Sequence, residues 1–215
     1  MLPGFYEASR VVIRMLLLLL TRWQVKGKEN VPSQGPLLIV ANHIGSADPA
    51  LISAGISRKV AFMAKEELFC SKFFGLFIRS LGAFPVHRGR IDKKAFSQAN
   101  QILAEGKALL MFPEGRRSHN LQLQTALLGS ALVASRSRAL ILPVGISGSE
   151  KIQGVTWWLS SRPRITVNIG RPFSLPPVHS RLTREELTEL TDSIMTHIAE
   201  LLSPEYRGDY VGQGN

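Results

Sequence analysis

The sequence is poor in cysteine, in acidic side chains and in long apolar runs. A single cysteine, Cys70, among 215 residues excludes an internal disulfide, an all-cysteine zinc site and Cys-x-x-Cys redox chemistry, and it suits a reducing cytosol. We expect its thiol to be buried in the core. The 16 Asp and Glu are outnumbered by 26 Lys and Arg, which leaves a formal net charge of +10. Such a chain should meet anionic partners: nucleic acid, acidic lipid or phosphorylated small molecules.

The apolar segment near the N-terminus is too short to span a bilayer. Residues 11–20 are apolar except for Arg14, about half the length that a spanning helix needs. On a helical wheel one face is polar (Glu7, Arg10, Arg14, Thr21) and the opposite face is apolar (Phe5, Ala8, Val12, Met15, Leu16, Leu19, Trp23). This pattern predicts an amphipathic helix over residues 1–24 that contacts an anionic membrane, with its cationic face and Trp23 in the headgroup region. A helix packed on the domain's own core is the alternative.

The rest of the chain has the composition and periodicity of one α/β domain. Hydrophobic residues make up 45% and charged residues 20% of the sequence, a balance that supports a real core. Short apolar runs alternate with helical patterns. The runs predict strands at 36–41, 59–64, 83–86, 108–112, 139–146 and 164–169. The patterns between them predict helices at 49–56, 66–80, 91–105, 127–136 and 184–202.

We therefore expect a single domain over residues 25–203, with a central mostly parallel or mixed sheet flanked by helices. Thr183 is the expected N-cap of the last helix, because Glu185 and Glu186 follow it. Residues 204–215, rich in Gly and polar side chains, should form a loose tail.

A histidine and an aspartate follow the first predicted strand. The strand runs into Asn42 and His43, and a Gly-Ser turn then leads to Asp48 and Pro49. A His and an Asp five positions apart diverge by about 140° on a helix, so these two side chains can meet only across a tight turn. A carboxylate bound to one imidazole nitrogen leaves the other nitrogen free as a general base. Asp48 before Pro49 is also typical of a helix N-cap, and both roles can hold at once.

Arginines follow two later strands. The segment 112–118 reads Phe-Pro-Glu-Gly-Arg-Arg-Ser, in which a glycine that permits a sharp turn precedes two guanidinium groups able to grip phosphate through paired hydrogen bonds. Arg88 lies just past the strand at 83–86. Each arginine alone is typical of a solvated surface charge, but together they indicate an anionic substrate.

Taken in order, these segments resemble the PlsC-like glycerolipid acyltransferases, the lysophosphatidic acid acyltransferase (1-acyl-sn-glycerol-3-phosphate acyltransferase) family, over residues 25–152. The family blocks correspond to Asn-His-x4-Asp at 42–48, Lys-x-Glu-Leu at 65–68, the Arg after Gly-x-(x)-Pro-Val at 82–88, Phe-Pro-Glu-Gly-Thr-Arg-Ser at 112–118 and a proline-bearing apolar strand at 141–146. Two segments depart from the family. Arg116 replaces the usual Thr, and residues 125–129 read Thr-Ala-Leu-Leu-Gly where such enzymes often show Lys-Gly-Ala. Both departures bear on which acceptor is used more than on which reaction is catalysed.

The resemblance implies acyl transfer from a thioester of coenzyme A or acyl carrier protein to the free hydroxyl of 1-acyl-sn-glycerol-3-phosphate, which forms phosphatidic acid. His43 would remove the hydroxyl proton, and Asp48 would steady the imidazolium. The alcohol would attack the thioester directly, and backbone N–H groups near the start of the helix after Asp48 would stabilise the oxyanion. No bound cofactor and no metal are expected, since the five histidines lack zinc-ligand spacing.

The resemblance also implies the substrate contacts. Lys65, Arg88 and Arg117 would hold the acceptor phosphate, whereas Asn42, Glu114 and Gly115 would shape the loop and contact the substrate. A lysophospholipid acceptor that stays in the membrane places the enzyme peripherally on the cytoplasmic face of the cell membrane.

Other functions remain open alternatives. The acceptor could be another lysolipid, or the altered third block could mark a catalytically weak membrane-binding scaffold. A lipase is disfavoured, because residues 145–149 lack the final glycine of Gly-x-Ser-x-Gly. No recognition-helix pattern or aromatic RNA platform is present, so nucleic acid is not an expected partner.

Overall fold

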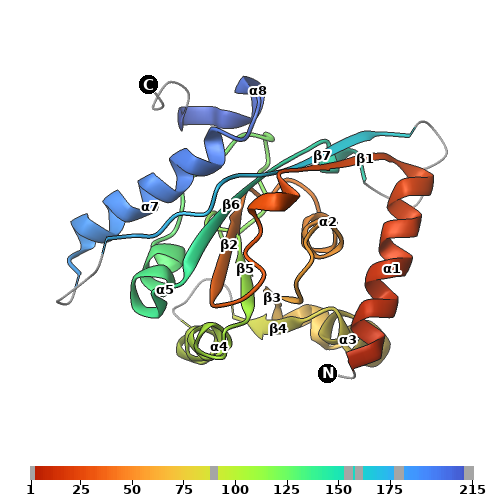
Figure 1. The fold of residues 1–215 in the computed structure, drawn as a ribbon, viewed down its shortest axis with the longest axis horizontal. Coiled ribbons are helices and arrows are strands. Elements are labelled where there is room, and N and C mark those ends of the chain that lie inside the picture. The colour runs from red at the N-terminus through yellow and green to blue at the C-terminus, as the bar shows by residue number, and fades with distance from the viewer. Residues whose placement is uncertain (1–2, 88–91, 153–156, 158–161, 177–181, 211–215) are drawn as a thin grey trace.

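The strands of the domain form one mixed sheet. A computed structural model describes residues 3–87, 92–152, 157, 162–176 and 182–210. Across these residues a seven-stranded sheet runs in the order β1-β7-β6-β2-β5-β3-β4 (Figure 1). The strands are β1 (Arg22–Lys26), β2 (Leu37–Ala41), β3 (Val60–Lys65), β4 (Ala83–Val86), β5 (Ala108–Met111), β6 (Leu140–Ser147) and β7 (Arg164–Ile169). Neighbours are parallel except β6 and β7, which confirms the predicted α/β fold with a mostly parallel sheet.

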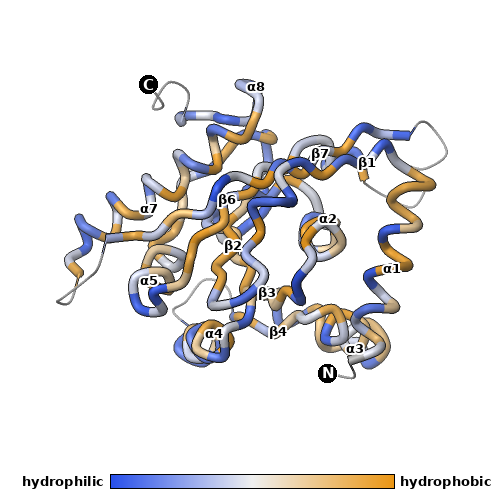
Figure 2. Tube along the Cα trace, viewed as in Figure 1, coloured by the Kyte–Doolittle hydropathy of each residue, from blue (hydrophilic) through white to orange (hydrophobic). Residues whose placement is uncertain are grey.

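Helices cover both faces of the sheet. They are α1 (Pro3–Leu20), α2 (Asp48–Gly55), α3 (Lys72–Ser80), α4 (Lys93–Ala104), α5 (Gly129–Ser137), α7 (Arg184–Ala199) and α8 (Pro204–Arg207), with 3₁₀ turns at Lys28–Asn30, Glu66–Phe69, Ser149–Lys151 and Gly208–Tyr210. Side chains of α1, α2 and α3 join the core on one face, and those of α4, α5 and α7 join the core on the other (Figures 1 and 2).

The central strand β2 shows why the site lies where it does. Leu37 and Ile39 enter one core, whereas Leu38 and Val40 enter the other, because successive side chains of a strand alternate. All four are fully buried, as a parallel strand covered on both faces requires. The chain therefore leaves β2 at the middle of the carboxyl edge of the sheet, the edge at which ligands bind in open α/β sheets.

Strand β1 and its Trp23 correct the prediction for the N-terminal segment. The helix ends at Leu20, and residues 22–26 pair in parallel with β7. Trp23 is only 9% exposed and belongs to the core, so it does not lie in a headgroup region. In β1, Trp23 and Val25 alternate with polar residues, but the partner that makes this a strand lies about 140 residues away along the chain.

Cys70 and the C-terminal segment also differ from their predictions. Cys70 is exposed, because the predicted helix at 66–80 breaks into a 3₁₀ turn and α3, and the cysteine lies between them. The segment 204–210 is folded rather than loose. Tyr206 and Tyr210 pack against the second core, the Tyr206 carbonyl accepts from Leu123 N, and the Tyr206 hydroxyl donates to Glu150 Oε1. By contrast, Thr183 does cap α7, in a full capping box with Glu186.

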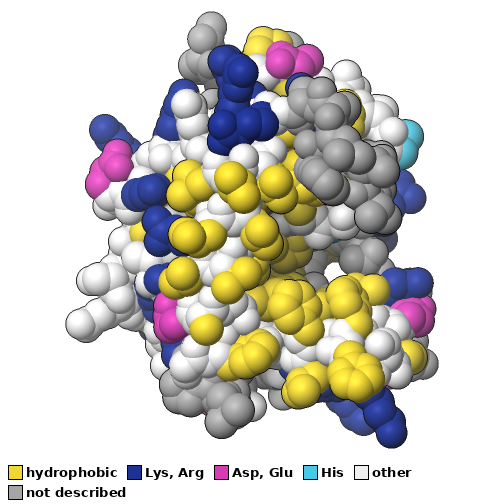
Figure 3. Space-filling view, turned by 90° about the vertical axis from the view of Figure 1, so that its right-hand side faces the viewer, with side chains coloured by type: hydrophobic (Ala, Val, Ile, Leu, Met, Phe, Trp, Pro, Cys, Tyr) yellow, Lys and Arg dark blue, Asp and Glu magenta, His cyan; other side chains and the backbone are white. Residues whose placement is uncertain are grey.

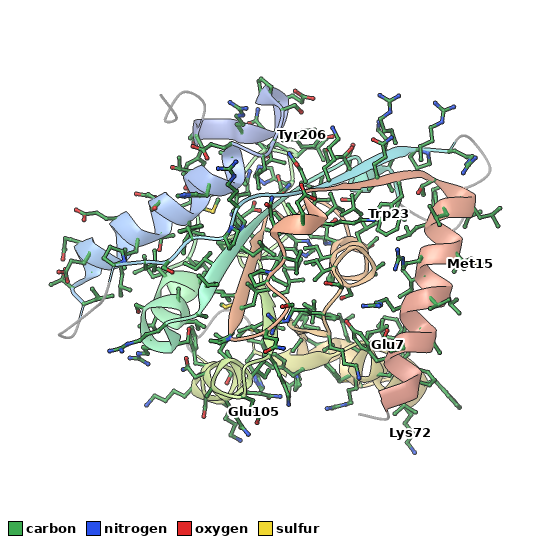
Figure 4. All side chains as sticks on the ribbon, viewed as in Figure 1. Glu7, Met15, Trp23, Lys72, Glu105 and Tyr206 are labelled. Carbon is green, nitrogen blue, oxygen red and sulfur yellow. The ribbon has the colours of Figure 1, made fainter. Side chains whose placement is uncertain are left out.

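Helix α1 turns one face to the domain and the other to solvent. Tyr6 and Leu17 are buried, and Arg10 Nη1 donates to the carbonyls of Ile56 and Ser57 just past α2. The Arg10 guanidinium is thus bound by backbone carbonyls of the domain, which corrects the expectation that it faces anionic lipid. On the outer side Met15 is 66% exposed and points away from the sheet (Figure 4). Over the described residues, no helix has the length and apolar character needed to cross a bilayer.

Candidate active site

The side chain of Asn42 anchors the end of β2 to β6. Its Oδ1 accepts from Ile146 N at 2.7 Å and its Nδ2 donates to Ile146 O at 2.9 Å. Asn42 is 2% exposed, so its amide fixes the backbone that leads to His43 instead of facing a ligand. Asn42 thus shapes the site from inside the protein, and its substrate contact stays a prediction.

His43 and Asp48 meet across the turn that follows Asn42. His43 Nδ1 lies 2.7 Å from Asp48 Oδ2, and the aspartate is fully buried. The same oxygen accepts from the N–H groups of Ile44 and Gly45, each at 2.8 Å. A carboxylate only accepts, so the proton between the pair resides on Nδ1 and Nε2 carries the free lone pair. The imidazole is thus held in the tautomer that a general base needs.

The same hydrogen bonds correct the capping prediction for α2 and show which N–H groups before Pro49 are already bound. The Asp48 carboxylate does not cap α2; Ala47 holds the N-cap position and no side chain caps the helix. The N–H groups of Ile44 and Gly45 bind Asp48, the N–H of Asp48 donates to the Gly45 carbonyl, and Pro49 has no N–H. The N–H groups of Ile44, Gly45 and Asp48 are therefore engaged, and oxyanion stabilisation by N–H groups after Pro49 stays a prediction.

The loop 112–118 supports His43 from the neighbouring strand β5. The Phe112 ring stacks on the His43 imidazole with centroids 4.1 Å apart. Glu114 Oε1 accepts from His43 N at 2.8 Å, and Ser118 N donates to His43 O at 2.7 Å. Gly115 has the positive φ (68°) that the sharp turn requires, as its residue type predicts. Both backbone groups of His43 are thus bound by one loop.

Glu114 is buried beneath this loop. It is 4% exposed, and its second oxygen accepts from Gln124 N at 3.0 Å. Burial raises the pKa of Glu114 to about 7; the N–H groups of His43 and Gln124 oppose the rise, and the negative charge of Asp48 adds to it. Glu114 therefore holds the loop from a position that faces inward, and its predicted substrate contact stays a prediction.

We expect Glu114 to make stability depend on pH. Its pKa of about 7 in the folded chain exceeds the ordinary 4.5, so stability present below pH 4.5 is lost as the pH rises through about 7. The loss amounts to at most about 3 kcal/mol. Denaturant unfolding at pH 5 and pH 8 should show this fall in the free energy of unfolding, and Glu114→Gln should remove it. Identical pH dependence in the two proteins would contradict the assignment.

An apolar cavity of about 210 Å³ opens beside His43. Its wall includes Met63, Val86, Phe96, Met111, Phe112 and Leu127, with His87 and Asp92 among the polar residues. The His87 imidazole is itself bonded to Asp92 and pairs with Glu66. Apolar walls beside a histidine base suit a ligand with an alkyl chain next to its reacting group.

The predicted phosphate-binding cations differ in their surroundings. Arg117 is exposed and precedes Ser118, whose N–H binds His43, so its backbone lies next to the pair. Lys65 ends β3 at the same edge of the sheet, but its amine pairs with Glu67 at 3.0 Å. Arg88 lies outside the described residues. Of the two described cations, Arg117 thus has its backbone next to the His43–Asp48 pair, whereas the amine of Lys65 is paired; the phosphate-binding roles stay predictions.

Ser149 is a site residue that the sequence reasoning missed. Its hydroxyl donates to Asp48 Oδ1 at 2.5 Å, and the residue is fully buried. No local pattern signals this contact, since the two residues are 101 positions apart. Within the part of the chain that the structure describes, no three His, Cys, Asp or Glu side chains are grouped to hold a metal ion.

Comparison with known proteins agrees with this geometry. A family model described as Acyltransferase matches residues 22–147, more than half of the chain and a range that includes His43 and Asp48. The chain belongs to the PlsC-like family of acyltransferases.

Two relatives and one solved structure illustrate the likeness. Over 206 residues the chain is 29% identical to the 1-acyl-sn-glycerol-3-phosphate acyltransferase of Streptococcus pneumoniae. The alignment covers 92% of this chain and 73% of that protein. The Bacillus subtilis protein of the same name is 26% identical over 198 residues, with 91% and 96% covered. The crystal structure of the 1-acyl-sn-glycerophosphate (LPA) acyltransferase PlsC from Thermotoga maritima shares the fold, with a TM-score of 0.71 at 23% identity over 91% of this chain and 78% of that one.

Proposed function

We propose that the protein transfers a fatty acyl group from a thioester donor to the free hydroxyl of 1-acyl-sn-glycerol-3-phosphate, forming phosphatidic acid. The observation that carries this proposal is the buried His43–Asp48 pair, with Nε2 free, beside an apolar cavity. The names of the two relatives support the choice of acceptor.

The reaction follows from the pair and the cavity. The cavity takes the acyl chain of the donor, and His43 Nε2 accepts the proton of the acceptor hydroxyl as its oxygen attacks the thioester carbonyl carbon. The carbon–sulfur bond then breaks, and the leaving thiolate takes the proton from the imidazolium. Asp48 stabilises the imidazolium while it exists. The donor is a co-substrate, either acyl-CoA or the acyl thioester of acyl carrier protein, and no other cofactor takes part.

An acyltransferase assay tests the proposal and the choice of donor together. Purified protein is given one of two donors that carry a radiolabelled acyl group, acyl-CoA or the acyl thioester of acyl carrier protein. Each donor is tested with three acceptors: lysophosphatidate, a lysophospholipid with a larger headgroup, and glycerol 3-phosphate. We expect labelled phosphatidate from lysophosphatidate. Transfer only to another acceptor would move the proposal to that lysolipid, and no transfer from either donor would favour a membrane-binding scaffold.

We expect Arg117→Ala and Arg88→Ala to weaken use of the phosphate-bearing acceptor. A lost charged hydrogen bond costs about 1.5–3 kcal/mol, which corresponds to roughly a tenfold to hundredfold loss in kcat/KM. Arg116→Ala is the matched control and should cost less, because the family's Thr at that position needs no cation. Steady-state kinetics with varied lysophosphatidate measures the loss. An equal loss for an acceptor without a phosphate would count against phosphate binding.

We also propose that the protein docks peripherally on the cytoplasmic face of the cell membrane through α1 and α3. The docking surface consists of exposed apolar side chains on α1 (Phe5, Val12, Met15, Leu16, Leu19) and on α3 (Phe73, Phe74, Leu76, Phe77). Figure 3 shows hydrophobic side chains gathered on this face, bordered by Lys and Arg. An exposed apolar surface with basic borders suits the interface of an anionic bilayer, where a lysolipid acceptor resides.

A further inference from the structure

Ser149 binds the oxygen of Asp48 that is not bonded to His43. It begins the 3₁₀ turn after β6, and its hydroxyl donates to Asp48 Oδ1 at 2.5 Å. The other three donors, from His43, Ile44 and Gly45, all bind Oδ2. Ser149 is therefore the one donor to Oδ1 among the described residues, and it comes from a different part of the sheet.

The packing around Ser149 leaves its hydroxyl little freedom. A Cβ added at Gly45 would lie 2.8 Å from both the Oγ and the carbonyl oxygen of Ser149. The backbones thus touch, and Ser149 is fully buried. A buried carboxylate with donors on both oxygens cannot rotate about its Cβ–Cγ bond without breaking hydrogen bonds in low dielectric.

We propose that Ser149 is a positioning residue for acyl transfer, which acts through Asp48; this inference rests on the proposed function. Its hydroxyl fixes the plane of the carboxylate and draws negative charge toward Oδ1. Without it, more charge falls on Oδ2, the imidazolium of His43 is stabilised too strongly, and the base is free only at higher pH. Among the described residues, the other charged or titratable groups beside the pair are Glu114, which binds His43 N, Arg116 near Glu114, and His87 and Asp92 in the cavity wall.

Ser149→Ala should therefore lower kcat and shift its pH dependence. We expect kcat to fall about tenfold, the effect of one hydrogen bond to a charged group, with KM for both substrates within about twofold. The acid limb of the profile of kcat/KM against pH should move to higher pH. Ser147→Ala, two positions earlier on β6, is the matched control and should change neither quantity. A purely structural role of Ser149 would lower stability or kcat but leave the acid limb in place, and that result would overturn the proposal.

A double-mutant cycle tests whether Ser149 acts through Asp48. In the Asp48→Asn background, Ser149→Ala should cost less than about twofold, because the charge that the hydroxyl moderates is gone. Additive losses would overturn the proposal. If the unaltered protein transfers no acyl group, the proposed function fails separately. The NMR titration of the His43 imidazole then decides the Ser149 question without substrate: a midpoint at higher pH in Ser149→Ala supports the proposal, and an unchanged midpoint contradicts it.

Discussion

Replacing His43 with alanine should lower acyl transfer by a factor of about 10²–10⁴, the contribution of a positioned general base. The fold should remain, because the loop 112–118 binds the backbone of this residue and the backbone is unchanged. Asp48 keeps three of its four donors in this variant. Transfer of labelled acyl groups measures the effect, and circular dichroism with thermal unfolding confirms the fold.

Two further variants test whether the loss in His43→Ala comes from the missing general base. Asp48→Asn should be less severe than His43→Ala, since the imidazole stays in place, although it loses the charge that stabilises the imidazolium and the carboxylate that fixes its tautomer. His197→Ala is the matched control: His197 also stacks on a phenylalanine, Phe173, at 3.9 Å, but on α7 and away from the cavity. It should retain full activity. Near-normal turnover of His43→Ala, with an unchanged melting profile, would show that the catalytic assignment is wrong.

Replacing Leu16 and Leu19 together with aspartate should release the protein from anionic liposomes, even at low salt. These side chains are 49% and 69% exposed on the outer side of α1. Burying a leucine side chain gains about 1.5–3 kcal/mol, so losing two weakens partitioning by a factor of about 10²–10⁴. Raising salt on the unaltered protein should release only part of it. The electrostatic contribution is small, since Arg10 is bound by the domain and each free arginine adds about 1 kcal/mol.

A control variant with the same added charge shows whether release from the liposomes comes from the lost apolar burial or from the two new carboxylates. Thr188→Asp and Ser193→Asp place two carboxylates on α7, on the side of the molecule opposite α1 (Figure 1). This protein should still sediment with the vesicles. Full sedimentation of the Leu16 and Leu19 variant would show that α1 does not carry the contact, and Phe73 and Phe77 on α3 would then be the next pair to replace.

Local patterns predict the centre of this fold well and its edges less well. Strand β2 is apolar at every position because both of its faces are covered, so its run of five residues is visible in the sequence. Strand β1 is an edge strand of five residues with charged ends, and only its pairing with β7 reveals it. The predicted helix at 66–80 is interrupted between the 3₁₀ turn and α3, and the prediction of a buried Cys70 thiol at this break is wrong.

In the candidate site, too, residues that are close in the sequence could be predicted, whereas contacts between distant segments could not. His43, Asp48 and Glu114 lie within short blocks, and the turn needed to join the first two follows from their spacing. Ser149 reaches Asp48 only because β2 and β6 are neighbours in the sheet. Arg10 forms hydrogen bonds with two carbonyls just past the end of α2, a contact that a helical wheel cannot include. Pairings across the sheet and between helices are absent from any local pattern.

The attachment of α1 determines how the whole molecule would move on a membrane. Near its start, the Tyr6 hydroxyl accepts from Val60 N; near its end, Arg162 donates to the carbonyls of Leu18 and Thr21. One residue later the chain enters β1, which pairs with β7 along its full length. Helix α1 is thus attached to the domain near both ends and cannot move independently of it. On the proposed docking surface His43 would keep a constant height above the lipid, and encounters with the acceptor would become a lateral search in two dimensions.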